Sequence, residues 1–456
     1  MRRSTCLRSA ALLFVAVSLS LGTALADDVA VTVYNSNLGV VSENRTLRFE
    51  KGINRLAFRD VPSQIDASSV TFEITTPGKN ATILEQNFAF DLVSPAKMYA
   101  RYIDEAVELI DKEGRLYGGK LLSHGGGAVT LQDGSGRVKI VSLENITEVK
   151  FPVLPEGLIT RPTLFWLYNS DFSGPLECRV SYQTSGMNWT AEYVGVLNHD
   201  ETKLDLTGWS SISNTSGKTY KDATLRLIAG DISRVRPAAP RMMRKTLALE
   251  EAVAGAGFEE KEFFEYHLYT LPRKVTVADK EIKQISLFEP ASTPVEKVYL
   301  YQPDRNPRQV KVTVEFRNSR EAGLGMPLPA GRIRLFKADD DGAMILLGED
   351  RIRHTPKDEE LKVTVGYAFD IAAEEKLIDQ VRISSRVDER EWEIELRNHK
   401  NEDITISVEK RLYGFWEIIE SNYEFLKKDA NTVVFEVPVK ANSNATLKLK
   451  VRFTTK

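Results

Sequence analysis

Apolar and polar residues alternate along most of this chain, and this period of two is the feature that most constrains its fold. The alternation is clear at residues 31–34, 310–316 and 446–453. Successive side chains of a β-strand point to opposite faces, so each such segment has one face for a core and one for solvent. The sequence therefore predicts a mainly β protein built from half-buried antiparallel strands.

Turn-forming pairs punctuate these segments at the spacing of hairpins. Examples are Lys51-Gly52, Asp133-Gly134, Ser216-Gly217 and Asp341-Gly342. Glycine and aspartate adopt the backbone conformations that tight turns require. The predicted fold class is a set of antiparallel β-sandwich modules with a small SH3-like or Sm-like barrel and few short helices.

The first 26 residues have the pattern of a signal peptide. Arg2, Arg3 and Arg8 precede an apolar run over residues 10–21, and Ala24 and Ala26 supply the small residues of a cleavage site. A membrane anchor is the alternative, but this run has about a dozen residues and a spanning helix needs about 20. We expect residues 1–26 to be removed, leaving a periplasmic or extracellular protein without a transmembrane anchor.

The composition of the mature chain argues against several classes of protein. Loss of three arginines leaves 58 basic residues against 64 acidic ones, a net charge of −6, so nucleic acid is not an expected partner. Of the two cysteines, Cys6 leaves with the signal and Cys178 cannot form an intramolecular disulfide. Because Cys178 lies in an alternating segment, we expect it to be a small buried hydrophobic residue.

Two modules are predicted in the first third of the mature chain. Residues 27–94 have the strand pattern of a small β-sandwich, with strands near 29–34, 45–50, 53–58, 70–75 and 82–90. Residues 95–156 begin with Ser94-Pro95, which can cap a short helix reaching Ile103. Five short strands with Gly-rich turns then follow, near 107–110, 116–122, 128–131, 138–141 and 146–151.

The succession of short strands and Gly-rich turns in residues 95–156 resembles that of SH3-like and Sm-like barrels, notably at Gly118-Gly119-Lys120-Leu121-Leu122. A competing interpretation continues the helix to Asp111, because apolar residues from Tyr99 to Ile110 also have helical spacing. The barrel is the favoured interpretation. Neither interpretation specifies a function.

The remaining β-rich sequence is interrupted once. Residues 157–235 form the first part of a C-terminal β-rich region, and residues 263–456 form the rest. Between them, residues 236–245 are rich in Pro, Met and basic residues, and residues 246–262 are rich in Ala and Glu. The segment 236–262 is predicted to be a flexible loop with a weak helix, either a surface excursion or a partner-binding segment.

Several short motifs in the C-terminal region occur in an order that resembles a known bacterial family. They are Trp166-Leu167-Tyr168-Asn169, residues 186–193 (GMNWTAEY), 225–230 (LRLIAG), 264–269 (FEYHLY), 326–331 (MPLPAG), 348–350 (GED) and 354–356 (HTP). Together they resemble domain-of-unknown-function family 4139, which includes the mucoidy-inhibitor A-like exported proteins, over roughly residues 159–456. The chain lacks the long coiled-coil insertion of that type. The resemblance implies an exported β protein without an assigned catalytic site, and no functional residue carries over.

No constellation of residues has the spacing of a catalytic or metal site. The histidines are far apart and lack the i, i+4 pairing or cysteine partners of zinc sites; they are His124, His199, His267, His354 and His399. Asp339-Asp340-Asp341-Gly342 could offer oxygens to calcium, but it lacks the alternating ligands of a known loop, so an acidic hairpin turn is predicted. We predict no cofactor and no metal, and the sequence leaves any catalytic residues unknown.

Aromatic residues could alternatively form a binding platform. The tryptophans are Trp166, Trp189, Trp209, Trp392 and Trp416, and in alternating strands most of them are expected in sandwich cores. The sequence thus favours a non-enzymatic envelope protein that binds a protein or a glycan as a scaffold or adaptor. Two alternatives stay open, a hydrolase of envelope polysaccharide or peptide and a lectin-like module, because carboxylates can converge across a fold without any signal in sequence spacing.

Overall fold

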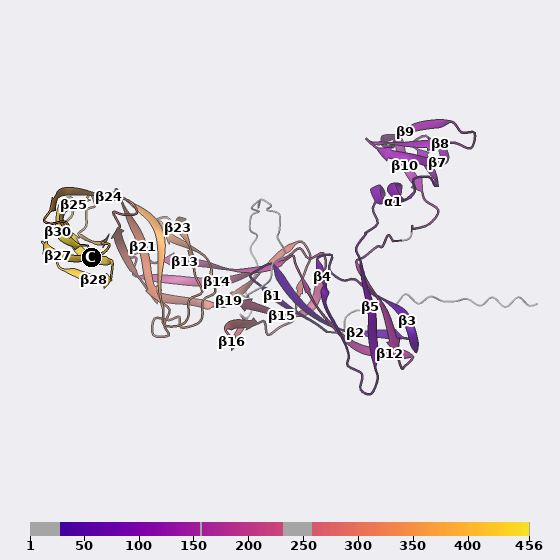
Figure 1. The fold of residues 1–456 in the computed structure, drawn as a ribbon, viewed down its shortest axis with the longest axis horizontal. Coiled ribbons are helices and arrows are strands. Elements are labelled where there is room, and N and C mark those ends of the chain that lie inside the picture. Colours follow the sequence, from indigo (N-terminus) through magenta and orange to yellow (C-terminus); the bar gives the residue numbers. More distant parts are fainter. Residues whose placement is uncertain (1–27, 156, 231–257, 456) are drawn as a thin grey trace, which may run out of the picture. The chain divides into compact units, whose positions relative to one another are not determined.

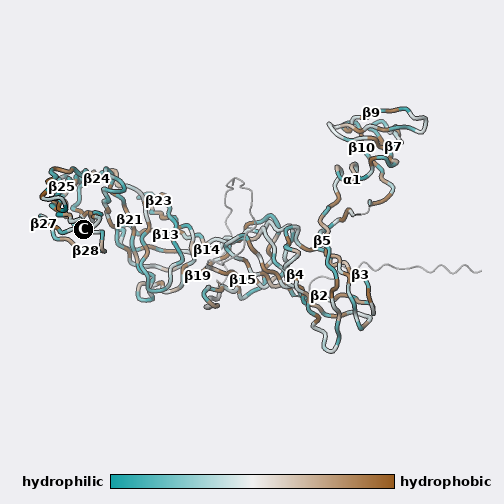
Figure 2. The backbone as a smooth tube through the Cα atoms, in the orientation of Figure 1, coloured by the Kyte–Doolittle hydropathy of each residue, from teal (hydrophilic) through white to brown (hydrophobic). Residues whose placement is uncertain are grey.

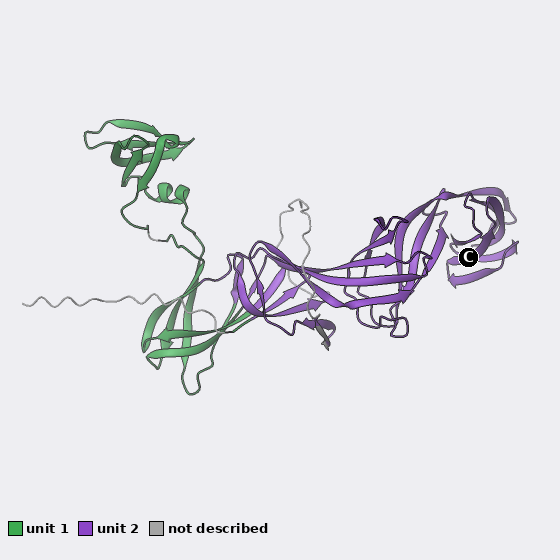
Figure 3. Ribbon diagram, turned by 180° about the vertical axis from the view of Figure 1, so that it is seen from behind, with its two compact units in different colours: residues 1–29, 42–59, 70–181 green, residues 30–41, 60–69, 182–456 purple. Residues whose placement is uncertain are grey.

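A computed structural model describes residues 28–155, 157–230 and 258–455, and it divides into two compact units (Figures 1 and 3). The mainly β prediction is confirmed: the described residues contain 30 strands, one α-helix and one 3-10 helix. The alternation of polar and apolar residues continues along the strands of both units (Figure 2). Four strands have residues in both units: β1 (Asp28–Tyr34), β2 (Leu38–Phe49), β4 (Ile65–Ile74) and β12 (Gly174–Thr184).

Unit 1 comprises residues 1–29, 42–59 and 70–181 and contains a three-stranded antiparallel sheet of order β3-β11-β5. Its core is aromatic: Phe58 stacks on Trp166 with ring centroids 5.1 Å apart, and Phe49 meets Tyr168 edge-on at 4.9 Å. Arg45 lies buried over the ring of Phe58 and donates to the buried carboxylate of Glu43. The strands are β3 (Gly52–Arg59), β5 (Ala81–Ala89) and β11 (Thr163–Ser170).

The predicted five short strands of residues 95–156 are present as one antiparallel sheet of order β10-β6-β7-β8-β9. Helix α1 (Pro95–Arg101) begins at Ser94, whose hydroxyl accepts from the Lys97 backbone N–H as an N-cap. Asp104 has a φ of 72°, and the chain continues as a strand, so the alternative of a helix reaching Asp111 is wrong. The elements are β6 (Ala106–Asp111), β7 (Leu116–Gly125), β8 (Ala128–Gln132), β9 (Val138–Ser142), the 3-10 helix η1 (Leu143–Asn145) and β10 (Ile146–Lys150).

Unit 2 comprises residues 30–41, 60–69 and 182–456, and its first half contains two groups of strands. Strand β15 pairs with β1 in parallel, with β17 in antiparallel fashion and with the short β18, and β16 lies beyond β17. A second sheet has the order β19-β14-β13-β22-β23. The strands are β13 (Met187–Leu197), β14 (Lys203–Asn214), β15 (Tyr220–Ala229), β16 (Glu259–Phe263), β17 (Tyr266–Thr270), β18 (Val275–Val277), β19 (Glu281–Pro294), β22 (Gly331–Ala338) and β23 (Met344–Ile352).

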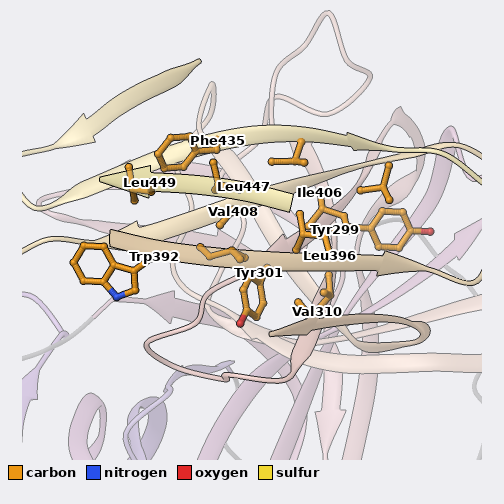
Figure 4. Packing of buried hydrophobic residues seen from close by; sticks show 14 of the residues in the cluster. Tyr299, Tyr301, Val310, Trp392, Leu396, Ile406, Val408, Phe435, Leu447 and Leu449 are labelled. Atoms are coloured by element: carbon orange, nitrogen blue, oxygen red, sulfur yellow. The ribbon is translucent and has the colours of Figure 1, made fainter. Parts of the chain in front are cut away.

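The C-terminal half of unit 2 is one nine-stranded sheet of order β27-β30-β25-β24-β21-β20-β26-β29-β28. Its strands gather around a single apolar core, in which Leu396, Ile406 and Leu447 lie between the strands that carry them (Figure 4). Strand β24 is long enough to pair with β21 through its first part and with β25 through its second. The strands are β20 (Glu296–Tyr301), β21 (Gln309–Arg317), β24 (Glu360–Arg382), β25 (Val387–Asn398), β26 (Ile404–Arg411), β27 (Phe415–Ser421), β28 (Phe425–Asp429), β29 (Thr432–Val439) and β30 (Ser443–Thr454).

Within the described ranges, parallel pairings join strands that are distant in sequence: β1 with β15, β13 with β22, and β20 with β26. A parallel pair needs a long crossover connection, so local sequence gives no signal for it. These pairings bring together side chains that no spacing rule relates. The pairing of β20 with β26 joins β24 and β26 into one sheet, through β21 and β20.

Candidate interaction surface

Two of the predicted features fall mainly outside the described residues. The cleavage residues Ala24 and Ala26 lie outside them, as does most of the segment 236–262. The last residues of that segment, from Glu259, belong to strand β16 and not to a helix.

The histidines are spread over the described residues and are held by different neighbours. His124 stacks on Tyr99 with ring centroids 5.6 Å apart. His354 follows strand β23, and its Nδ1 accepts from the Ala330 backbone N–H at 3.1 Å. His199 lies at an exposed turn beside Asp200. This arrangement does not bring the histidines together around one reacting centre.

Asp339, Asp340 and Asp341 form the predicted acidic turn between β22 and β23. Backbone hydrogen bonds close the turn, from Asp339 N–H to the Ala343 carbonyl and from Gly342 N–H to the Asp339 carbonyl, each at 2.9 Å. Side-chain oxygens of Asp339 and Asp341 also accept backbone N–H groups within the turn. Gly342 has a φ of 85°, the left-handed conformation that explains the glycine.

Cys178, the cysteine within the described residues, is buried, as predicted. Cys178 is inaccessible to solvent on strand β12, and burial raises the pKa of its thiol to about 12. A thiol with so high a pKa has almost no thiolate at neutral pH and is a poor nucleophile.

Most of the tryptophans are also core residues, as expected. Trp166, Trp189 and Trp392 are buried, whereas Trp209 and Trp416 are half-buried. The indole N–H of Trp416 donates to the Ala430 carbonyl at 2.9 Å. The described tryptophans therefore do not form an exposed platform of the kind that the lectin-like alternative requires.

The fold assembles one charged cluster that no sequence motif predicts. Lys410 of β26 points into the nine-stranded sheet with only 5% of its side chain exposed. Its Nζ lies 2.8 Å from Glu375 of β24 and 3.3 Å from Asp304, and 5.1 Å from the ring centre of Trp392. Sequence separations of 35 and 106 residues explain why no motif search finds this cluster.

Electrostatically, the Lys410 cluster is a buried ammonium shared by two carboxylates. Burial raises the pKa of Glu375, and the hydrogen bond and charge of Lys410 oppose that rise. The second carboxylate oxygen of Glu375 is buried without a hydrogen-bond partner among the described residues. Asp304 also accepts the Arg411 backbone N–H at 3.0 Å. The cluster links β24 to β26, and the ammonium of Lys410 balances the charge of its carboxylate neighbours.

A second ionic network joins β20 to β22. Glu201 accepts from Lys297 and from Lys337, the latter at 2.7 Å. Burial alone would raise the pKa of Glu201, but the hydrogen bonds and charges of the two lysines lower it to about 2. Glu201 is therefore a carboxylate whose role is to hold strands together.

Exposed apolar residues occur on strands β23 and β24 near the contact between these strands, and we call them the β23–β24 patch. Phe369 is 99% exposed. The other members are each about half exposed: Met344, Ile345, Leu346 and Tyr367. A cluster of exposed aliphatic and aromatic side chains is uncommon on a soluble surface and marks an interaction site.

Local contacts show how these residues come together. The Thr364 backbone N–H donates to Asp350 at 2.8 Å, and at Gly348 a Cβ would lie 2.0 Å from the Val365 carbonyl oxygen. Residue numbers fall along β23 as they rise along β24, so the strands run antiparallel at this contact. Residues 344–346 of β23 and residues 367–369 of β24 therefore lie on the same side of the contact between Gly348 and Val365. Each segment is within about 14 Å of that contact, measured along its strand. Gly348 permits this close approach.

Two features of the surroundings of the patch bear on binding, the free space at Gly366 and the charge of a neighbouring turn. At Gly366, between the contact and Tyr367, an added Cβ would meet nothing within 4 Å. The acidic turn of Asp339, Asp340 and Asp341 directly precedes Met344 and is exposed. A sequence signal did exist, because Met344-Ile345-Leu346-Leu347 breaks the alternation with four apolar residues in a row.

Residues 178–412 match a family described as a domain of unknown function, DUF4139. The chain belongs to the DUF4139 family. The predicted resemblance is thereby confirmed, although the matched segment is shorter than residues 159–456. No curated protein matches this DUF4139 chain at a significant level.

The matched DUF4139 segment includes both the β23–β24 patch and the Lys410 cluster. It excludes β27 to β30 and the five-stranded sheet of unit 1. Among the described residues, no helix combines the length and the apolar character needed to cross a membrane.

Proposed function

We propose that this DUF4139 protein is an exported, non-catalytic binding protein of the bacterial envelope, and that it holds a partner protein at the β23–β24 patch. Export is inferred from the signal-like residues 1–26. The observation that carries the binding proposal is the fully exposed ring of Phe369 on β24, a strand that contacts β23, together with four half-exposed apolar side chains on these two strands.

The chemistry of the patch favours a protein over a glycan. Met344, Ile345, Leu346 and Phe369 offer no hydrogen-bonding side-chain group, whereas a sugar presents hydroxyls that must be matched when it is desolvated. Aromatic residues and methionine are enriched at the centres of protein interfaces. An apolar centre bordered by the acidic turn fits a protein partner.

The hydrolase alternative is supported by one observation, the convergence of Asp304 and Glu375. Their oxygens bound to Lys410 lie within about 6 Å of each other, near the separation used by retaining glycosidases. The ammonium of Lys410 occupies the space between them, where a substrate would have to bind. Substituting Asp304→Asn and Glu375→Gln should therefore leave any envelope-degrading activity of a preparation unchanged.

Site-specific photocrosslinking tests the proposed function. A benzophenone amino acid replaces Phe369 in the exported protein, and the matched control carries it at Phe264, which is 86% exposed on the β16–β17 hairpin. We expect one protein to crosslink in stoichiometric amounts from position 369 and not from position 264.

The captured protein is then purified, and its affinity for the mature chain is measured. Burial of one phenylalanine contributes about 2 kcal/mol, so Phe369→Ser should weaken binding about 30-fold, whereas Phe264→Ser should not. Equal crosslinking at both positions, or recovery of glycan fragments alone, would show that the proposal is wrong.

A further inference from the structure

The two free edges of the nine-stranded sheet belong to strands that follow each other in the chain. The strand order begins with β27 and ends with β28, and only residues 422–424 connect them. Residues 418–425 line a hollow of about 510 Å³ at this connection, which we call the β27–β28 corner. The corner lies outside the DUF4139 segment and shares no residue with the β23–β24 patch.

Apolar side chains surround the corner. Leu426 is 70% exposed, and Ile419 and Phe425 are 40% and 45% exposed. The pairing of β27 with β30 is irregular between Ile418 and Glu420, so Ile419 is an extra residue of a β-bulge. Exposed apolar residues on unpaired edge strands are the surface to which a further strand can add.

The corner is held in place before any partner binds. The side chain of Asn422 donates to the Thr446 carbonyl at 2.8 Å and accepts the Lys448 backbone N–H at 2.7 Å. The hydroxyl of Ser421 accepts the Tyr423 backbone N–H at 3.3 Å, and Phe425 packs on the buried ring of Phe435. A rigid site loses less conformational entropy on binding than a site that must first order.

The charge of the corner selects the partner. Glu420 and Glu424 line the hollow, and within the described ranges neither forms an ion pair. Lys450, which lies opposite Glu420 in the ladder, instead points its Nζ to 3.7 Å from Glu389. The Nζ of Lys427 on β28 lies 4.6 Å from the ring centre of Trp416 on β27 and not against either glutamate of the hollow. The two carboxylates and the apolar side chains therefore complement a segment that carries both apolar and basic residues.

We propose that the β27–β28 corner binds an extended segment of another protein, with alternating apolar and basic residues, as an added β-strand. The backbone of the segment pairs with an open edge, its apolar side chains enter the hollow beside Ile419 and Phe425, and its basic side chains reach Glu420 and Glu424.

Fluorescence anisotropy on the full mature chain tests this with a labelled nine-residue peptide that alternates lysine and valine. The Glu420→Lys, Glu424→Lys double variant should bind this peptide about tenfold more weakly, because two attractions become repulsions. The matched control, Glu296→Lys with Asp340→Lys, changes the net charge equally away from the corner and should bind as the parent does. Leu426→Ser should also weaken binding, and Phe369→Ser should not.

Two further peptides separate strand addition from unspecific attraction. A version of the probe with alternate backbone nitrogens methylated keeps its charge but loses several hydrogen bonds, so it should bind at least about tenfold more weakly. A peptide that alternates glutamate and valine should bind no better than the methylated peptide. Equal binding of either peptide, or no saturation up to about 1 mM probe, overturns the proposal. It is also overturned if light scattering shows a dimer that Leu426→Ser abolishes, because a second copy then occupies the corner.

Discussion

Replacing Lys410 with methionine tests how much the buried cluster contributes to the nine-stranded sheet. Methionine keeps most of the side-chain length, but it removes the ammonium that Glu375 and Asp304 share and that lies 5.1 Å from the ring centre of Trp392. Removing one member of a buried ion pair leaves an uncompensated charge. Full burial would cost about 3–5 kcal/mol, and since Glu375 and Asp304 are 18% and 34% exposed we expect about 2–3 kcal/mol.

The cost of Lys410→Met should depend on pH, and its direction follows from Glu375. Burial already raises the pKa of this carboxyl in the folded chain, and loss of Lys410 raises it further. A raised folded-state pKa means that the folded chain binds more protons than the unfolded one. Stability is then greatest below the ordinary pKa of 4.5 and falls as pH rises through the folded value. The difference between Lys410→Met and the parent should therefore shrink as pH falls from 7 towards 4.5.

Urea-dependent hydrogen exchange of peptides from β24 to β26 measures the free energy of unfolding of the sheet alone, and so the cost of Lys410→Met. The matched control is Lys448→Met, whose side chain is 64% exposed and lies 3.9 Å from Glu393. It should cost at most about 0.5 kcal/mol. A Lys410→Met cost no larger than that of the control, or one that does not change between pH 7 and 4.5, would refute the argument.

Three further predictions concern other buried groups. Asn398 is fully buried, donates to the carbonyls of Glu402 and Lys440 and accepts the Lys400 N–H. Asn398→Ala should therefore cost about 2–4 kcal/mol in urea unfolding, against about 0.5 kcal/mol for Asn444→Ala, at an exposed position of β30. The pKa of Glu201 is lowered to about 2, so its contribution to the stability of the folded chain is complete above pH 4.5 and is lost as pH falls through 2. Glu201→Gln should remove about 1–2 kcal/mol of this acid dependence, measured by pH-jump unfolding. Burial raises the pKa of Cys178 to about 12, so iodoacetamide at pH 8 should leave the native chain unmodified by mass spectrometry and add one group only in urea.

The sequence located most strands because each strand buries one face. Segments such as 29–34 and 53–58 fall within β1 and β3, and the five short strands of residues 95–156 match β6 to β10 within a few residues. The helix alternative for residues 104–111 failed because Asp104 reverses the chain and the following apolar residues face a sheet core. Strand β2 begins at Leu38, earlier than the predicted strand near residues 45–50. The alternation rule missed this start because Gly39-Val40-Val41 departs from strict alternation.

The candidate surfaces were visible in the sequence only in part. The apolar run 344–347 is a local signal, but its neighbour Phe369 occupies an ordinary place in an alternating strand. Only the tertiary contacts between β23 and β24, at Gly348 with Val365 and at Asp350 with Thr364, bring the two strands together. The β27–β28 corner had no local signal, because an edge strand and a central strand can have the same alternation.

By itself, the sequence determined the mainly β class, the turns and the membership of the DUF4139 family, because period-two burial and turn chemistry act between near neighbours along the chain. The tertiary structure alone decided which strands are adjacent and which edges stay open. Lys410 meets Glu375 and Asp304 only because β20, β24 and β26 join one sheet through non-local pairings. Such pairings depend on the packing of whole faces, which no short segment encodes.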